Sequence, residues 1–165
     1  MAKTVKKGDD GVRKKGDPLQ LPLPAAPFLP HSGPLLLIDQ VVALDHEQRS
    51  GQVRTTLRAH APYFVKGYFQ VHWLVELMAQ AVAALCQLLL LNPGGEPVNG
   101  YLIAIRSFNS TPALNLKVGE ILIIDCRFEV EMTSIGHCQC MIHTAEGLSC
   151  GTAELTFLRE AANEV

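Results

Sequence analysis

The chain has 165 residues, of which 48% are hydrophobic, and it carries a formal net charge of -2. One domain of ordinary size accounts for most of this length, and the apolar fraction excludes a chain that is disordered throughout. Residues 1–17 hold six Lys/Arg against three Asp but no aromatic side chain, so they predict a solvated tail rather than a nucleic-acid-binding segment. We therefore expect a tail over residues 1–20, a single domain over 21–160 and a second tail over 161–165.

The cysteines indicate the compartment. Five of them, without the spacing of a disulfide framework, occur in a chain whose basic N-terminal stretch runs into Gly, Asp and Pro instead of an apolar segment. That is not the pattern of a secretory signal peptide. We expect a cytoplasmic protein with reduced thiols, and neither a membrane nor a nucleic acid as a partner.

The first part of the chain predicts an extended lead-in followed by a hairpin. Proline recurs through residues 18–34, which excludes a long helix there. Residues 34–44, P-L-L-L-I-D-Q-V-V-A-L, have the apolar, β-branched character of a buried strand. Over residues 52–57 apolar and polar side chains alternate, which predicts a half-exposed strand, and we expect a loop over residues 58–70.

Residues 71–91, V-H-W-L-V-E-L-M-A-Q-A-V-A-A-L-C-Q-L-L-L-L, predict one long helix that the following N-P-G-G ends. About twenty apolar residues suffice to span a bilayer. However, Glu76, Gln80 and Gln87 interrupt this stretch, so we interpret it as a helix that protein surrounds on nearly all sides.

After the helix, four strand-like runs follow, separated by turns that each contain glycine. They cover residues 101–108, 120–132, 137–144 and 148–158. Long strands at such short spacing predict an antiparallel meander. The expected order is β-β-α-β-β-β-β, which is an α+β domain with one helix and about six strands.

Glu76 is the unusual residue of the predicted helix. Gln80 follows it by four positions and His72 precedes it by four, so all three share one helical face. A carboxylate in an apolar helix must find hydrogen bonds, because desolvation otherwise costs several kcal/mol. Two interpretations stay open from the pattern alone: a structural Glu that bonds to the backbone, or an acid–base catalyst.

Two motifs of the sequence resemble those of a known protein family. F-L-P-H-S-G-P-L-L-L-I-D-Q-V, residues 28–41, resembles the N-terminal signature of 3-hydroxyacyl-[acyl-carrier-protein] dehydratases, and L-V-E-L-M-A-Q-A, residues 74–81, resembles their central-helix signature. F-N-S-T-P-A-L-N-L-K-V-G-E-I-L is similar to a further segment of the family. The resemblance spans roughly residues 28–158. It implies the hot-dog fold, in which a curved antiparallel sheet wraps one long helix and two subunits pair edge to edge.

The resemblance also implies an activity. Dehydration of a 3-hydroxyacyl thioester needs a base for the proton next to the carbonyl, an acid for the leaving hydroxyl and donors for the thioester oxygen. In the family, a loop His and the helix Glu form the acid–base pair across the dimer interface, at the end of an acyl tunnel. Glu76 matches that Glu. The implied partners are acyl carrier protein and a second hot-dog subunit, identical or different.

The loop His of the family has no counterpart here. The family's G-H-F-P-G loop is replaced by the shorter K-G-Y-F-Q-V-H-W, which places Tyr68 at the position of the His. This loop, together with G-Y-L-I-A-I-R-S-F over residues 100–108, is similar to a divergent branch, the dehydratases of aryl-polyene pathways. Three residues are candidates to compensate: His72 at the helix start, Tyr68, and His31 in the L-P-H motif, although in the family the His of that motif is interpreted as structural. We further assign substrate contacts to His31, Gln80, Phe69, Trp73 and Arg106, the last as a contact for a phosphopantetheine phosphate.

The stretch H-C-Q-C-M-I-H, residues 137–143, has two cysteines and two histidines, the residue types that bind zinc. On a strand, Cys138 and Cys140 face one side while His137 and His143 face the other, so the ligands are divided. No C-x-x-C partner occurs elsewhere. We expect core thiols, solvent-facing histidines, and neither a metal nor a redox cofactor.

Two rival functions remain. A hot-dog thioesterase uses a helix carboxylate to activate water and does not require the loop His. A catalytically silent subunit that pairs with an active dehydratase is the non-enzymatic alternative, and the missing loop His is the observation that favours it.

Overall fold

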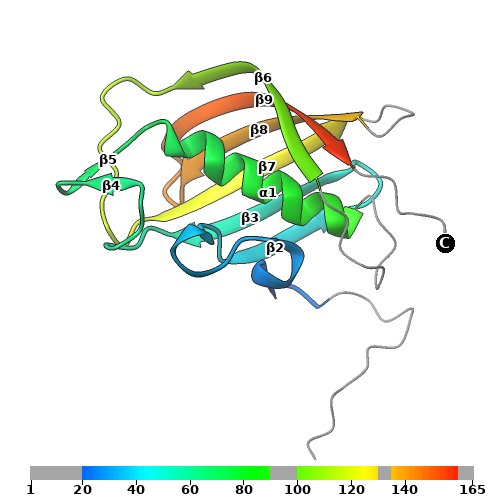
Figure 1. Ribbon diagram of the computed structural model, residues 1–165, viewed down its shortest axis with the longest axis horizontal. Coiled ribbons are helices and arrows are strands. Elements are labelled where there is room, and N and C mark those ends of the chain that lie inside the picture. The colour runs from blue at the N-terminus through cyan, green and yellow to red at the C-terminus, as the bar shows by residue number, and fades with distance from the viewer. Residues whose placement is uncertain (1–19, 90–99, 130–134, 160–165) are drawn as a thin grey trace, which may run out of the picture.

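The computed structural model describes residues 20–89, 100–129 and 135–159. A single α-helix, α1 (Trp73–Leu89), lies within these residues on the concave side of a curved sheet (Figure 1). This is the hot-dog arrangement that the two motifs imply. The two tails expected at the ends of the chain fall almost entirely on residues 1–19 and 160–165, outside the described residues.

Seven antiparallel strands form the main sheet, in the order β1-β2-β3-β7-β8-β9-β6. The strands are β1 (Leu23–Pro24), β2 (Gln40–Asp45), β3 (Ser50–Thr56), β6 (Gly100–Ser110), β7 (Ile121–Glu129), β8 (Ile135–Thr144) and β9 (Ser149–Arg159). All six predicted strands are present, and β1 is an addition of two residues. Buried and exposed side chains alternate along β3, β7 and β8, because every second residue points toward the helix.

The first predicted strand, over residues 34–44, begins too early. The structure has 3₁₀ helices at Ala26–Phe28 and Gly33–Leu35, and the strand begins only at Gln40. Pro34 has no N–H to give to a sheet and a fixed φ, and Gly33 adopts a φ of +56°. The lead-in therefore winds in turns beside α1 before it enters the sheet (Figure 1).

The loop expected over residues 58–70 contains a small separate hairpin. Strands β4 (Phe64–Val65) and β5 (Tyr68–Phe69) pair around Lys66 and Gly67, whose φ angles are +51° and +83°. Positive φ at both central residues is the geometry of a tight hairpin turn, and glycine makes it accessible. Contacts among the rings of Tyr63, Phe64 and Phe69 hold the hairpin at the N-terminal end of α1.

The helix is buried on most of its circumference. Its buried side chains are Leu74, Leu77, Met78, Gln80, Ala81, Val82, Ala84, Leu85, Cys86 and Leu88. Each large apolar member contributes about 1.5–3 kcal/mol by leaving water. Within the described residues, no helix has the length and apolarity needed to cross a membrane.

Gly51 on β3 explains how closely the helix approaches the sheet. A β-carbon at this position would lie 2.5 Å from Cδ2 of Leu85 and 2.9 Å from the carbonyl oxygen of Ala43. The absent side chain thus leaves room for the last turns of α1 to pack onto the strand.

Strand β6 forms one edge of the sheet. It pairs with β9 on one side, and among the described residues no strand lies on its other side. Nearly all of its side chains are exposed, including Tyr101, Leu102, Ile103 and Ile105 at 42–50%. An apolar, unpaired edge strand is a template for pairing with another chain.

Candidate active site

Gln80 connects the helix to the N-terminal lead-in. Its Oε1 accepts a hydrogen bond from the Leu37 N–H at 2.9 Å, and its Nε2 donates to the Leu35 carbonyl oxygen at 2.8 Å. The same Nε2 donates to Oε1 of Glu76 at 2.9 Å. The side chain is 1% exposed, so a buried amide is satisfied by three partners at once. It fixes both the lead-in and the Glu76 carboxylate.

Glu76 faces an open space rather than the core. Its side chain is 41% exposed, which corrects the expectation of a carboxylate enclosed by protein. The Nε2 atom of His31 lies 3.6 Å from Oε1 of Glu76. This separation is longer than a hydrogen bond, but it places an imidazole beside a carboxylate, two groups of the kind that acid–base catalysis uses.

The second nitrogen of the His31 ring, Nδ1, is buried and has no hydrogen-bond partner among the described atoms. Buried polar atoms of this kind are usually paired, so this unpaired nitrogen at the cavity wall requires an explanation. His31 lies between the two 3₁₀ helices, where Pro30 and Gly33 set the course of the backbone.

The pair lines a cavity of about 660 Å³ that runs along α1. Its walls come from the lead-in, from the helix face that begins at Glu76, and from β6 and β9. They are Pro27, Phe28, Leu29, Pro30, His31, Glu76, Ala79, Gln80, Val82, Ala83, Cys86, Gln87, Gly100, Tyr101, Leu102, Leu155 and Phe157. Acid–base groups at one end of a mostly apolar channel are suited to a substrate with a reactive head and an apolar tail.

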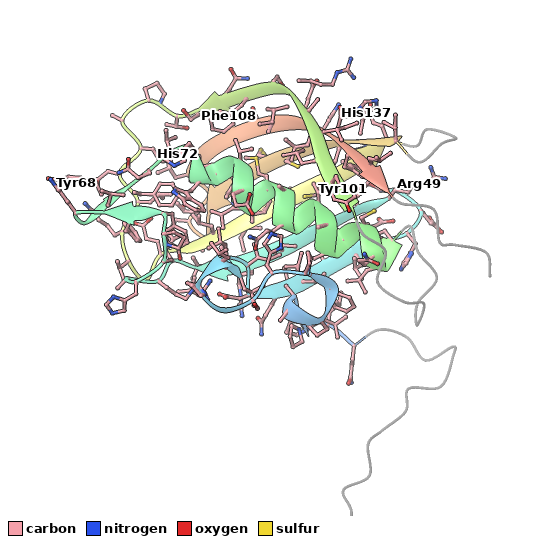
Figure 2. All side chains as sticks on the ribbon, viewed as in Figure 1. Arg49, Tyr68, His72, Tyr101, Phe108 and His137 are labelled. Carbon is pink, nitrogen blue, oxygen red and sulfur yellow. The ribbon has the colours of Figure 1, made fainter. Side chains whose placement is uncertain are left out.

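Five predicted site residues do not line this cavity. Tyr68 is 70% exposed at the tip of the β4–β5 hairpin, and His72 is exposed at the helix start, with its ring centre 5.8 Å from that of Trp73 (Figure 2). Trp73 and Phe69 are half-buried against the core, and Arg106 is exposed on β6. Within one chain, the residues brought together are Glu76, Gln80 and His31.

The first N–H groups of α1 are not free to bind a thioester oxygen. Those of Trp73, Leu74 and Val75 donate to the carbonyl oxygens of Gln70, Val71 and His72 at 3.0–3.2 Å. Helix starts often leave such donors open, but here a tight first turn uses them.

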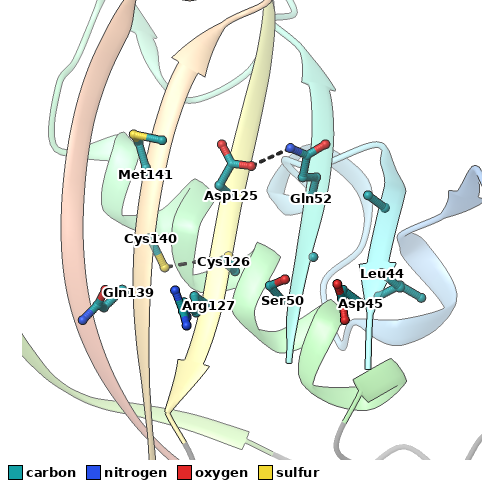
Figure 3. Close-up of a pocket in the computed structure, with 12 residues that line it drawn as sticks. Leu44, Asp45, Ser50, Gln52, Asp125, Cys126, Arg127, Gln139, Cys140 and Met141 are labelled. Carbon is teal, nitrogen blue, oxygen red and sulfur yellow. Dashed lines mark hydrogen bonds between the residues drawn. The ribbon is translucent and has the colours of Figure 1, made fainter. Parts of the chain in front are cut away.

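A second hollow, an open groove of about 510 Å³, lies on the opposite face of the sheet (Figure 3). Polar side chains of β3, β7 and β8 line it, and Gln52 donates to Asp125 at 2.7 Å across it. The other carboxylate oxygen of Asp125 contacts Nε2 of His143 at 2.9 Å. These groups satisfy one another, and the sheet separates them from Glu76.

Comparison with known proteins identifies the family. The model of the ApeP-like family, described as ApeP dehydratase, matches residues 23–164. The chain belongs to the ApeP-like dehydratases. This match confirms the resemblance drawn from the two motifs, including its divergent aryl-polyene branch, and the assignment as a dehydratase.

Individual relatives agree with the family. The 3-hydroxyacyl-[acyl-carrier-protein] dehydratase FabZ of Xylella fastidiosa strain M23 is 27% identical over 117 residues, which cover 66% of this chain and 70% of that protein. Among solved structures, a chain of the ApeI:P dehydratase heterocomplex from Xenorhabdus doucetiae superposes with a TM-score of 0.73 at 20% identity, covering 86% of this chain and 94% of that one.

Thioesterase structures are similar as well. A hypothetical thioesterase from Streptococcus pneumoniae TIGR4, solved with coenzyme A, has a TM-score of 0.57 at 14% identity, covering 73% of this chain and 84% of that one. At these identities, the likeness to solved structures establishes the hot-dog fold and nothing finer.

Proposed function

We propose that this ApeP-like dehydratase converts 3-hydroxyacyl thioesters on acyl carrier protein into trans-2-enoyl thioesters. The observation that carries the proposal is the pair of His31 and Glu76, 3.6 Å apart at the wall of an apolar cavity. Elimination of water next to a thioester requires two such groups and a place for the acyl chain. The X. fastidiosa relative, named for this activity, supports the substrate class.

In the proposed mechanism, the two groups share one proton. Neutral His31 takes the proton from the carbon next to the carbonyl, and protonated Glu76 gives its proton to the departing hydroxyl, which leaves as water. The double bond forms between the two carbons. Afterwards the imidazolium returns its proton to the carboxylate, so the pair is restored without any net change.

Gln80 orients the pair but does not take part in proton transfer. Its Nε2 donates to Oε1 of Glu76 while two backbone groups hold the amide in place. A carboxyl group whose geometry is fixed before the substrate arrives needs little rearrangement in the transition state.

A second hot-dog subunit is the proposed partner at β6. The exposed apolar side chains of this edge strand favour a chain that extends the sheet, either a second copy or a different dehydratase subunit. The heterocomplex from X. doucetiae supports the second alternative. Such a partner would also close the β6 side of the cavity, where Tyr101 and Leu102 are half-exposed.

The compartment proposed for this reaction is the cytoplasm. All five cysteines are buried and none forms a disulfide in the described structure, a state typical of proteins in a reducing environment. Elimination of water involves no net oxidation or reduction, so we propose that the enzyme needs no redox cofactor and that the phosphopantetheine arm of the carrier holds the substrate.

Replacement of Glu76 tests the proposal. Glu76→Gln keeps the size and the hydrogen bonding of the side chain but cannot release a proton, so dehydration of a 3-hydroxyacyl carrier protein should fall by about 10²–10⁴-fold. Formation of the enoyl product and release of free thiol are followed in the same reaction. Thiol release without enoyl product would support the thioesterase instead.

A catalytically silent subunit would give different assay results. In that case the purified chain alone is inactive, an active partner dehydratase restores turnover, and Glu76→Gln in this chain leaves the restored activity unchanged. Undiminished dehydration by Glu76→Gln in the chain alone would overturn the proposed role of the carboxylate.

A further inference from the structure

Three of the five cysteines meet in one cluster beneath the helix. Cys126 on β7 and Cys140 on β8 are directly opposite in the strand register, and Cys138 is two residues from Cys140 on the same face. Their sulfur atoms are close. Cys126 and Cys140 are 3.8 Å apart (Figure 3), and Cys138 and Cys140 are 3.8 Å apart. All three sulfurs lie within 4.8 Å of one another.

This spacing matches the dimensions of a metal–thiolate centre. Three points separated by about 3.8–4.8 Å lie roughly 2.2–2.5 Å from a common centre, and a protein zinc–sulfur bond is about 2.3 Å long. The sulfurs therefore need to move little to surround one ion. Strand pairing fixes their β-carbons, so the arrangement exists before an ion binds.

The surroundings limit the coordination number. Cys126, Cys138 and Cys140 are 1–4% exposed within the hydrophobic core. His137 and His143 point to the other face and bond to Thr156 and Asp125. All cysteines and histidines of the chain fall within the described residues, and none of the others joins the cluster.

We propose that Cys126, Cys138 and Cys140 form a binding site for one thiophilic d¹⁰ metal ion of low coordination number, of which Cu(I) is the representative. Soft thiolate ligands select such ions over hard ones. Zn(II) is the poorer occupant, because its structural sites are almost always tetrahedral with four protein ligands, and this cluster offers three.

Metal binding would also change the protonation of the cluster. Cysteine ligates a metal ion as the thiolate, so binding displaces thiol protons and its affinity depends on pH. The positive ion also compensates thiolate charge that an apolar core disfavours.

One layer of sheet separates the cluster from the outer face of the molecule. Cys126 and Cys140 also line the open groove on the outer face, so only the strands themselves separate the thiols from solvent. A bound ion would link β7 to β8. These two strands pair over eight residues, and the link would oppose their separation during unfolding.

The test uses the full chain and Cu(I) under anaerobic conditions, with a colorimetric Cu(I) chelator as competitor. We expect the unmodified chain to retain one Cu(I) per chain. Replacement of a ligand, as in Cys126→Ser, Cys138→Ser or Cys140→Ser, should weaken retention by more than the roughly 10–100-fold that loss of an outer-shell partner costs. Cys150→Ser is the matched control: its thiol is fully buried but lies outside the cluster, so retention should be unchanged.

Two measurements on the unmodified chain test the proposal even if the cysteine variants fail to fold. X-ray absorption at the copper edge should count three sulfur neighbours, and Cu(I) should raise the melting temperature where Zn(II) raises it less. Mixed nitrogen and sulfur ligation, equal losses in Cys150→Ser and Cys140→Ser, or retention no better than that of a cysteine-free protein would each overturn the proposal.

Discussion

The Nε2 atom of His31 lies 3.6 Å from Oε1 of Glu76, and a single chain supplies both residues. The resemblance to acyl-carrier-protein dehydratases implied a different origin for the imidazole, namely a loop before the helix that meets the Glu across a dimer interface. Here that loop carries Tyr68, which is exposed. The lead-in segment instead brings its own imidazole to the carboxylate.

Replacement of His31 tests its role as the base. We expect His31→Gln to lower kcat by about 10²–10⁴-fold with little change in melting temperature, because the ring makes no hydrogen bond that holds the fold. His72→Gln is the matched control and should stay within a few-fold of the unmodified rate. If His72→Gln lost activity and His31→Gln kept it, the base would be His72, contributed by another subunit.

Most of the fold could be predicted because its signals are local. Alternation along β3, β7 and β8 and the apolar run of α1 report burial residue by residue. The β4–β5 hairpin was missed, since its turn needs a positive φ at Lys66 as well as at Gly67, and lysine does not signal one.

The candidate site could be predicted in part. The positions of Glu76 and Gln80 on one helical face follow from their spacing. The structural interpretation expected a hydrogen bond from the Glu76 carboxylate to the backbone, and the bond is present but to Gln80. The catalytic interpretation agrees with the cavity that the carboxylate faces. The position of His31 could not be predicted from periodicity. It depends on the course of a proline-rich segment that has no repeating pattern and is fixed by long-range bonds to Gln80.

Gln80→Leu should affect both stability and catalysis. The substitution keeps the volume but leaves the buried Leu37 N–H without its partner, which costs about 1–3 kcal/mol. It also removes the part-buried bond to the Leu35 carbonyl oxygen. Glu76 and the lead-in also lose their common anchor, so kcat should fall. Urea denaturation measures the change in the free energy of unfolding, and steady-state kinetics measure the change in kcat. Gln87→Leu, on the same helix and cavity wall, is the comparison: a loss as large there would mean that the Gln80 bridge has no special role.

Charge on the β6 edge should separate the proposed subunits. Ile103 and Ile105 are about half-exposed, and a lysine at either position would place a charge where another strand is expected to pair. We expect Ile105→Lys to shift the protein to monomers in sedimentation experiments. Val118→Lys, an equally exposed apolar position outside β6, should leave the assembly unchanged. A monomeric unmodified chain, or a dimer that tolerates Ile105→Lys, would place the interface elsewhere.

Gly136 should control the width of the cavity through Phe157. A β-carbon at Gly136 would lie 2.4 Å from Cζ of the Phe157 ring, which lines the cavity and packs edge-on against Phe128 at a centroid distance of 5.9 Å. Gly136→Ala must displace that ring, at a cost of about 1–3 kcal/mol for an overpacked core. If the ring moves toward the cavity, the ratio of kcat/KM for long to short acyl chains falls. Adding Phe157→Leu removes the ring atoms that clash. The double variant should therefore lose less stability than the two single substitutions would lose in sum, and its chain-length ratio should rise again. A Gly136→Ala variant with unchanged stability and an unchanged ratio would show that Phe157 does not depend on this glycine.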